Sequence, residues 1–155
     1  MKEVIDLLIK NNKTISTMES CTGGMIANEI TNIPNSSKVF NFSGVTYSNS
    51  FKIKMGVSEE LINKYSVYSI EVAHDMAKKI SEFTNSNYGV GVTGKLKKID
   101  ENNLYGEDDI VYLSIYDKDK DFYYDEKIKL NYDDRIDNKK QILNIFVDKI
   151  KKLLK

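Results

Sequence analysis

The stretch that decides the fold reads Lys13-Thr-Ile-Ser-Thr-Met-Glu-Ser-Cys-Thr-Gly-Gly-Met-Ile-Ala-Asn-Glu-Ile-Thr31. Its first part, residues 13–18, is short and rich in β-branched side chains, which predicts a buried strand. Residues 24–31 predict a helix, and the residues between the two leave room only for a tight turn. A strand that enters a helix through a tight turn is typical of an α/β domain.

The turn between that strand and that helix is the strongest chemical feature of the sequence. It holds Ser20 at the point where the strand ends. The backbone amides of Cys21, Thr22, Gly23 and Gly24 can converge there on an oxyanion or a phosphate. The two glycines remove the side chains that would block a close approach. The alternative is a helix capped by Ser or Thr and followed by glycines that serve only packing.

The rest of the chain alternates strands and helices and then ends in a hairpin and a long amphipathic helix. The segments and spacing imply a three-layer α/β/α fold in which helices cover both faces of a mixed sheet of about five strands. We expect one domain over residues 1–155, with no linker or internal repeat. The expected strands are 13–18, 39–47, 87–93, 110–116 and 122–130, and the expected helices are 3–10, 24–31, 50–55, 59–65, 70–83 and the segment that follows residue 134.

The composition excludes several classes of partner. Lys plus Arg and Asp plus Glu both number 23, so the net charge is zero and nucleic acid is not expected as a partner. No apolar run approaches the roughly 20 residues that cross a bilayer, and the first residues lack a signal-peptide pattern, so no membrane contact is expected. The single cysteine, Cys21, fits a reducing compartment, and we therefore expect a cytoplasmic protein.

Arg135 is the only arginine among 23 basic residues. A planar guanidinium binds carboxylate and phosphate groups through two parallel hydrogen bonds, which a lysine cannot do. A lone arginine in a lysine-rich chain can therefore mark an anion-binding position. The alternative is that one of many basic positions happens to be arginine.

Several blocks of the sequence together resemble one family, the CinA carboxy-terminal domain, whose members include nicotinamide-nucleotide amidases. The resemblance starts at residues 17–24 and continues in order along nearly the whole chain. The later blocks are Ile33-Pro-Asn-Ser-Ser37, Gly44-Val-Thr-Tyr-Ser-Asn-Ser-Phe-Lys52, Val92-Thr93-Gly94 and Asp134-Arg135.

The resemblance implies a serine–lysine amidase that releases ammonia from nicotinamide mononucleotide, as in NAD salvage. It implies that Ser20 is the nucleophile, Lys52 its general base and Tyr47 an orienting hydrogen-bond partner. A lysine can take a proton from serine only if burial lowers its pKa. The resemblance implies no cofactor and no metal, a small nucleotide as partner, and leaves a homodimer open, since relatives often dimerise. The implied substrate-binding residues are Cys21, Thr22, Gly23, Gly24, Thr93 and Arg135.

One segment departs from the family pattern. The family usually follows the third strand with a glycine- and proline-rich loop, whereas residues 95–109 hold one glycine and no proline. Lys95, Lys97 or Lys98 could replace the lost backbone contacts with phosphate. The alternative is a non-catalytic or divergent member that binds a nucleotide or another phosphorylated ligand.

Three other patterns predict no site. Residues 89–94 fit a dinucleotide-binding pattern, but their glycines alternate with valines inside a strand instead of forming a loop after it. Asp117, Asp119 and Asp121 resemble a calcium loop, but Phe122 stands where that loop requires glycine, so a hairpin turn is expected. The only histidine, His74, lies off the apolar face of its helix, and we expect it to be solvated.

Overall fold

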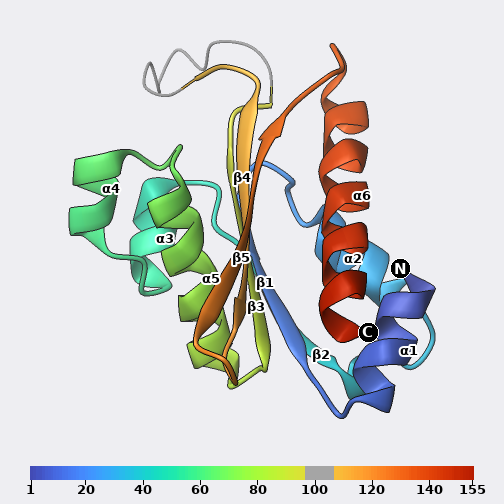
Figure 1. Ribbon diagram of the computed structural model, residues 1–155. Helices are drawn as coiled ribbons and strands as arrows, with labels where there is room; N and C mark the ends of the chain where they lie inside the picture. The colour runs from blue at the N-terminus through green and yellow to red at the C-terminus, as the bar shows by residue number, and fades with distance from the viewer. Residues whose placement is uncertain (97–106) are drawn as a thin grey trace.

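The computed structural model describes residues 1–96 and 107–155, which form a five-stranded sheet with helices on both faces (Figure 1). The strand order is β2-β1-β3-β4-β5. Strand β1 pairs in parallel with β2 and β3, whereas β4 pairs antiparallel with both β3 and β5. The sheet is therefore mixed, as the sequence predicts. The strands are β1 (Ile15–Glu19), β2 (Phe40–Val45), β3 (Tyr88–Gly94), β4 (Ile110–Asp117) and β5 (Phe122–Lys129).

The helices form two layers. In Figure 1, α1, α2 and α6 lie on one side of the sheet, and α3, α4 and α5 lie on the other. A short 3₁₀ turn, η1 (Ser36–Lys38), leads from the first layer back to the edge strand β2. The helices are α1 (Lys2–Lys10), α2 (Met25–Thr31), α3 (Asn49–Lys54), α4 (Glu59–Tyr65), α5 (Ile70–Thr84) and α6 (Arg135–Leu154).

The helix α5 packs unusually close to the strand β3 because two glycines of that strand face it. A Cβ atom at Gly89 would lie 1.9 Å from the carbonyl oxygen of Ala77, and one at Gly91 would lie 2.2 Å from that of Ala73. Real atoms never come this close, so only glycine permits the contact. The glycines of residues 89–94 therefore serve the packing of a helix on a sheet.

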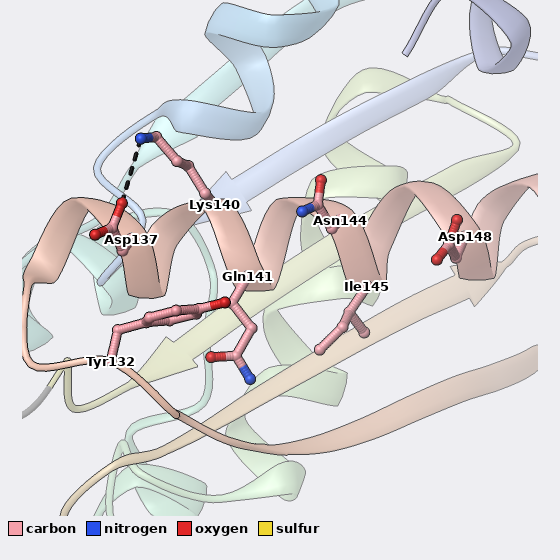
Figure 2. A pocket seen from close by; sticks show the side chains of 7 residues that line it. All are labelled: Tyr132, Asp137, Lys140, Gln141, Asn144, Ile145 and Asp148. Atoms are coloured by element: carbon pink, nitrogen blue, oxygen red, sulfur yellow. Dashed lines mark hydrogen bonds and ion pairs between the residues drawn. The ribbon is translucent and has the colours of Figure 1, made fainter.

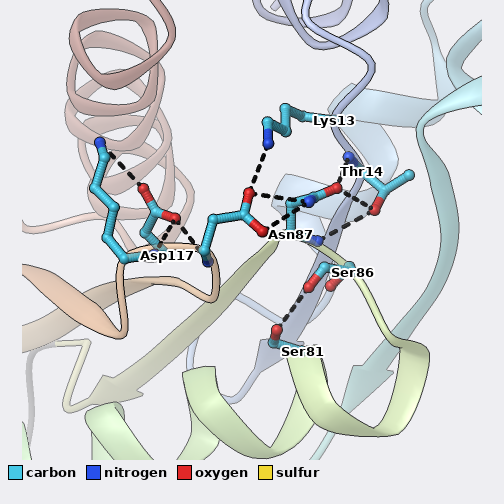
Figure 3. A network of polar contacts seen from close by, with 8 residues as sticks. Lys13, Thr14, Ser81, Ser86, Asn87 and Asp117 are labelled. Carbon is cyan, nitrogen blue, oxygen red and sulfur yellow. Dashed lines mark hydrogen bonds and ion pairs between the residues drawn. The ribbon is translucent and has the colours of Figure 1, made fainter.

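A polar network fixes the end of the sheet at which β1 and β3 begin (Figure 3). The side-chain oxygen of Asn87 accepts hydrogen bonds from the amide and the hydroxyl of Thr14, at 3.0 and 3.1 Å. Asp119, from the hairpin between β4 and β5, accepts from Lys13 at 2.6 Å and from Asn87. Deeper in the same region, Ser81 donates to the carbonyl of Ser86 at 2.7 Å. These contacts join the two parallel strands to the hairpin.

The opposite end of the sheet is where the parallel strands finish, and this end carries the candidate site. In open α/β sheets, ligands bind beside the carboxyl ends of the strands, because the residues that follow neighbouring strands meet there. Ser20 follows β1, Thr46 follows β2, and Thr93 and Gly94 end β3. The strand order places β1 between the other two, so Ser20 lies at the centre of this edge.

Candidate active site

Ser20 lies on a tight turn that begins directly after β1. Its amide donates to the carbonyl of Val92 on β3 at 3.0 Å, so the serine backbone is still anchored to the sheet. Gly23 donates to the carbonyl of Ser20 at 3.0 Å and closes the turn. Gly23 and Gly24 have φ angles of 63° and 91°, a backbone region that other residues rarely enter. The two glycines are thus required by the turn itself.

The carboxylate of Glu19 holds this turn and the start of α2, a role that the sequence analysis did not predict. It is fully buried and accepts the hydroxyl hydrogens of Thr17 at 3.2 Å and Thr22 at 2.6 Å. It also accepts the amides of Ile26 at 3.1 Å and Ala27 at 2.9 Å, so it caps the helix from the strand. The signal in the sequence is a carboxylate residue directly after residues 13–18, the segment that is predicted to be a buried strand.

Lys52 comes from α3, on the other side of the sheet, and reaches Ser20. The helix is capped by Ser48, whose hydroxyl accepts from the amide of Phe51. The Lys52 side chain is 1% exposed, and its amino group contacts Ser20 Oγ at 3.0 Å and the carbonyl oxygen of Thr46 at 2.7 Å. The structure therefore brings together the serine and the lysine that the resemblance pairs.

The surroundings of Lys52 favour its neutral form. Burial lowers the pKa of this amine from 10.5 to about 8, because the charged form loses its hydration. The carbonyl of Thr46 takes one N–H and so orients the amine toward the serine. A neutral amine at hydrogen-bond distance from a hydroxyl can accept its proton, which is the arrangement that activates a serine nucleophile.

Cys21, next to Ser20, is not an alternative nucleophile. Its thiol is buried, and burial raises its pKa to about 12, so it carries no thiolate near neutral pH. His74 lies elsewhere, on α5. Its Nε2 is 2.7 Å from a carboxylate oxygen of Asp125, and its ring stacks on Tyr123 with centroids 4.3 Å apart. His74 is thus partly exposed, off the buried face of α5, and it also has two partners on β5 that the sequence did not predict.

Tyr47 is not brought to the serine and the lysine. Its side chain is 67% exposed, and within residues 1–96 and 107–155 its hydroxyl has no hydrogen-bond partner. It follows Thr46 at the end of an edge strand, where neighbouring side chains point in opposite directions. The buried side chain at this position is that of Thr46, while Tyr47 faces outward.

The two remaining residues singled out by the resemblance lie in different surroundings. Thr93 is buried at the end of β3, and its hydroxyl donates to the carbonyl of Val67 at 2.7 Å. Arg135 is exposed at the first position of α6, and its guanidinium lies 3.5 Å from the carbonyl oxygen of Leu96. Within the described residues, its other donors have no hydrogen-bond partner.

Lys139 is a basic residue near the serine turn that the sequence analysis missed. It lies one helical turn after Arg135 on α6, so both residues share one face of that helix. Its Nζ would be 3.1 Å from a Cβ atom built on Gly23, which places the amine directly over the turn. In the part of the chain that the structure describes, no carboxylate pairs with this amine. The i, i+4 spacing from the lone arginine was the signal in the sequence.

Of the three lysines expected to replace the family loop, Lys95 alone can be placed. Its side chain is buried, its Nζ is 3.6 Å from a carboxylate oxygen of Asp108, and it lies 5.0 Å from the centre of the Tyr68 ring. Lys97 and Lys98 lie outside the described residues.

A cavity of about 460 Å³ lies elsewhere, along α6 and beside Tyr132 (Figure 2). It contains none of the residues that the sequence analysis singled out. In Figure 2 its polar side chains include the pair Asp137 and Lys140, whose atoms are 3.3 Å apart. Its remaining lining residues are Gln141, Asn144, Ile145 and Asp148.

Within residues 1–96 and 107–155, no group of three or more His, Cys, Asp or Glu side chains is placed to hold a metal ion. No helix within those residues combines the length and the apolar composition needed to cross a membrane.

Comparisons with known proteins agree with this fold and with the motifs. A CinA-like protein of Endomicrobium trichonymphae is 38% identical over 150 residues, which are 96% of this chain and 34% of that protein. The chain spans between about a quarter and a third of the length of such curated relatives.

Solved structures of similar fold include a competence-damaged protein (CinA) superfamily protein from Enterobacter cloacae. Its TM-score is 0.88 at 18% identity, over 99% of this chain and 89% of that one. A competence/damage inducible protein, CihA, from Agrobacterium tumefaciens has a TM-score of 0.78 at 25% identity, over 94% of each chain. The family model described as the CinA C-terminal domain matches residues 1–154. With that match over almost its whole length, this chain belongs to the CinA C-terminal domain family.

Proposed function

We propose that this chain is a serine–lysine amidohydrolase that converts nicotinamide mononucleotide to nicotinate mononucleotide and ammonia. The observation that carries the proposal is the 3.0 Å contact between Lys52 Nζ and Ser20 Oγ in a buried site. The carboxamide chemistry and the pyridine nucleotide come from the resemblance to the family's amidases. The geometry supports the chemistry, because a buried amine beside a serine hydroxyl is what a general base requires.

In the first half of the reaction, the Ser20 oxygen attacks the carboxamide carbon while the Ser20 proton passes to Lys52 Nζ. The oxygen of the tetrahedral intermediate then needs donors. The amides of Thr22 and Gly24 are candidates, because within the described residues they donate to no other group. Lys52 next returns its proton to the amide nitrogen, the C–N bond breaks, and ammonia leaves an acyl-enzyme. Water then releases the carboxylate and restores Ser20.

The phosphate of the nucleotide would bind Arg135 and Lys139. Both come from the first two turns of α6; Lys139 lies over Gly23 of the serine turn, and Arg135 lies beside Leu96, just after β3. The first free amides of α2 cannot serve this purpose, because Glu19 already accepts from Ile26 and Ala27. The phosphate is therefore assigned to the basic side chains of α6, of which Arg135 was expected from the sequence, and the free amides of the serine turn are assigned to the oxyanion.

The experiment is ammonia release from nicotinamide mononucleotide by the wild type, Ser20→Ala and Lys52→Met. The matched control is Lys54→Met, on the same helix but exposed. We expect release by the wild type and the control, and a loss of at least about a thousandfold in the other two. Equal rates in all four proteins, or no release by any, would contradict the proposal.

A second candidate function is ligand binding without turnover. The outward Tyr47 favours it, since the family arrangement would use that hydroxyl, and so does the pairing of Lys95 with Asp108, which engages a lysine that could have replaced the lost loop contacts. A thermal-shift panel of pyridine nucleotides tests this candidate. Stabilisation by a nucleotide that the wild type does not hydrolyse would support a binding module over an enzyme.

A further inference from the structure

The backbone of Thr46 is part of the serine–lysine site. Thr46 follows β2, one position beyond the register pair of Glu19 and Val45, and its amide donates to the carbonyl of Glu19 at 2.8 Å. Its own carbonyl accepts from Lys52 Nζ at 2.7 Å. Continuing the parallel register places Thr46 beside Ser20, with Lys52 reaching both residues.

The hydroxyl of Thr46 is exceptional among the buried hydroxyls near this edge. The residue is 2% exposed, yet Oγ1 has no hydrogen-bond partner within the described residues. Nearby hydroxyls are all satisfied: Thr17 pairs with Ser43 at 2.6 Å, and Thr22 donates to Glu19 at 2.6 Å. A buried polar group without a partner costs about 1–3 kcal/mol, so a ligand that supplies a hydrogen bond to Thr46 Oγ1 would remove that cost.

The direction of the Thr46 side chain follows from the alternation along a strand. Val45, the preceding residue, faces α2, because its side chain would be 3.3 Å from a Cβ atom on Gly24. Thr46 therefore faces the opposite side of the sheet, where α3 supplies Lys52. Ser20 faces the same side, since its hydroxyl meets Lys52. The unsatisfied hydroxyl thus faces the same side of the sheet as the Ser20 hydroxyl and the Lys52 amine.

We propose that the Thr46 hydroxyl holds the amide nitrogen of the substrate and then, after ammonia has left, the water that attacks the acyl-enzyme. This inference rests on the proposed amidase function. Lys52 gives a proton to the departing nitrogen and later takes one from the attacking water. The departing nitrogen and the attacking water must therefore occupy the same place beside the Lys52 amine.

A hydroxyl suits both halves of the reaction because its oxygen accepts without carrying charge. In the first half it accepts one N–H of the carboxamide, while the nitrogen takes its extra proton from Lys52 and leaves as ammonia. In the second half it accepts one O–H of water. The other water proton passes to Lys52, the new C–O bond forms, and the bond to Ser20 Oγ breaks as Lys52 returns the proton to it.

The kinetic test compares Thr46→Val, which removes the hydroxyl but keeps the shape, with Thr46→Ser, which keeps the hydroxyl. We expect Thr46→Val to lower kcat for ammonia release by about tenfold to a hundredfold with little change in KM. Thr46→Ser should restore most of the rate. Because the hydroxyl is unsatisfied, Thr46→Val should leave the melting temperature unchanged or raise it. A parallel loss of kcat and melting temperature, or an unchanged kcat, would overturn the inference.

Ser114 provides the matched control. Its hydroxyl is also fully buried and without a partner in the described residues, but it lies on β4, which is separated from β1 by β3. Ser114→Ala removes a similar atom from a similar environment. We expect wild-type kcat from this variant. A loss equal to that of Thr46→Val would show a general effect of emptying buried hydroxyl positions and would count against a role in the reaction.

Crystal structures of the free wild type and of Thr46→Val separate this inference from the amidase proposal. We expect an ordered water bonded to Thr46 Oγ1 and to Lys52 Nζ in the wild type, and its loss in the variant with the Ser20–Lys52 contact retained. A hydroxyl that instead donates to a protein carbonyl would overturn the inference whatever the activity. A wild type that releases no ammonia would contradict the amidase proposal. The presence or absence of an ordered water between Thr46 Oγ1 and Lys52 Nζ would still test the role of Thr46.

Discussion

The amine of Lys52 lies 3.0 Å from the hydroxyl of Ser20, although the two residues approach the sheet edge from different elements. Ser20 is held by the turn after β1, and Lys52 by a short helix of the opposite layer. Burial lowers the pKa of Lys52 from 10.5 to about 8, so its neutral form becomes the major one above that pH.

The activity should rise with pH. Lys52 can accept the Ser20 proton only in its neutral form, so kcat/KM should increase through an apparent pKa of about 8 and become level above it. The measurement is a pH profile of ammonia release between pH 6 and 10. A profile that falls over this range would mean that the protonated amine is the active form.

Replacing Lys52 by Met should stabilise the protein at neutral pH. The folded-state pKa of about 8 is below the unfolded value of 10.5, so below pH 8 the folded state carries the full cost of a buried charge. That cost is roughly 3 kcal/mol and disappears as the pH rises from 8 to 10.5. Unfolding free energies of both proteins at pH 7 and 10 check this. The wild type should gain stability relative to Lys52→Met on going to the higher pH.

Glu19→Gln should destabilise the fold by about 2–3 kcal/mol. The carboxylate accepts four hydrogen bonds, and an amide would present a donor to groups that are themselves donors. Urea unfolding measures the loss. Glu29→Gln is the control, because Glu29 lies on α2 and, within residues 1–96 and 107–155, its carboxylate accepts a hydrogen bond from Asn28 alone. If both variants lose the same stability, the buried carboxylate has no special role.

Gly89→Ala and Gly91→Ala should each cost about 2–4 kcal/mol. The added methyl groups would meet backbone oxygens of α5, which can move only if the helix shifts away from the sheet. Gly44→Ala is the control, since the nearest atoms are 3.7 Å from its Cβ position, an ordinary contact. Thermal unfolding of the three variants should separate the first two from the third.

Lys139→Ala should raise KM for the nucleotide by about tenfold with little change in kcat, because it removes one charge-assisted contact to the phosphate. Arg135→Ala should act in the same way. Lys140→Ala is the control, because Lys140 pairs with Asp137 on another face of α6. Removing the phosphate from the substrate should abolish the difference between Lys139→Ala and the wild type. If the difference remains with the dephosphorylated substrate, Lys139 does not bind phosphate.

The sequence predicted the elements well where local signals were strong. Strand β1, the glycine turn and α2 are consecutive in the chain. The hydrophobic periodicity, the β-branched residues and the turn residues of this stretch together predict all three elements. The five-stranded mixed sheet and both helix layers followed from the order of the elements. The short turn η1 lay inside a segment that was expected to be irregular, because three residues carry too little periodic signal.

The site was harder to predict because its contacts depend on how distant elements dock. The position of Lys52 beside Ser20 came from a family resemblance, since nothing around Lys52 in the sequence distinguishes it from the other lysines. The same resemblance placed Tyr47 at the site, but the end of the edge strand turns that side chain outward. Lys139 and the Glu19 carboxylate were missed because their roles depend on the packing of α6 and on the path of the backbone after β1.

The four contacts of Glu19 have a consequence for how such a protein can change over generations. The signature from Glu19 to Gly24 is kept in place by its own carboxylate, threonine and glycines, so it reports an intact scaffold. The proposed proton acceptor, Lys52, by contrast, is one side chain on a separate helix. A descendant could exchange Lys52 for an apolar residue, gain stability and keep all residues from Glu19 to Gly24 unchanged. Loss of catalysis in this lineage would therefore leave its most recognisable motif untouched.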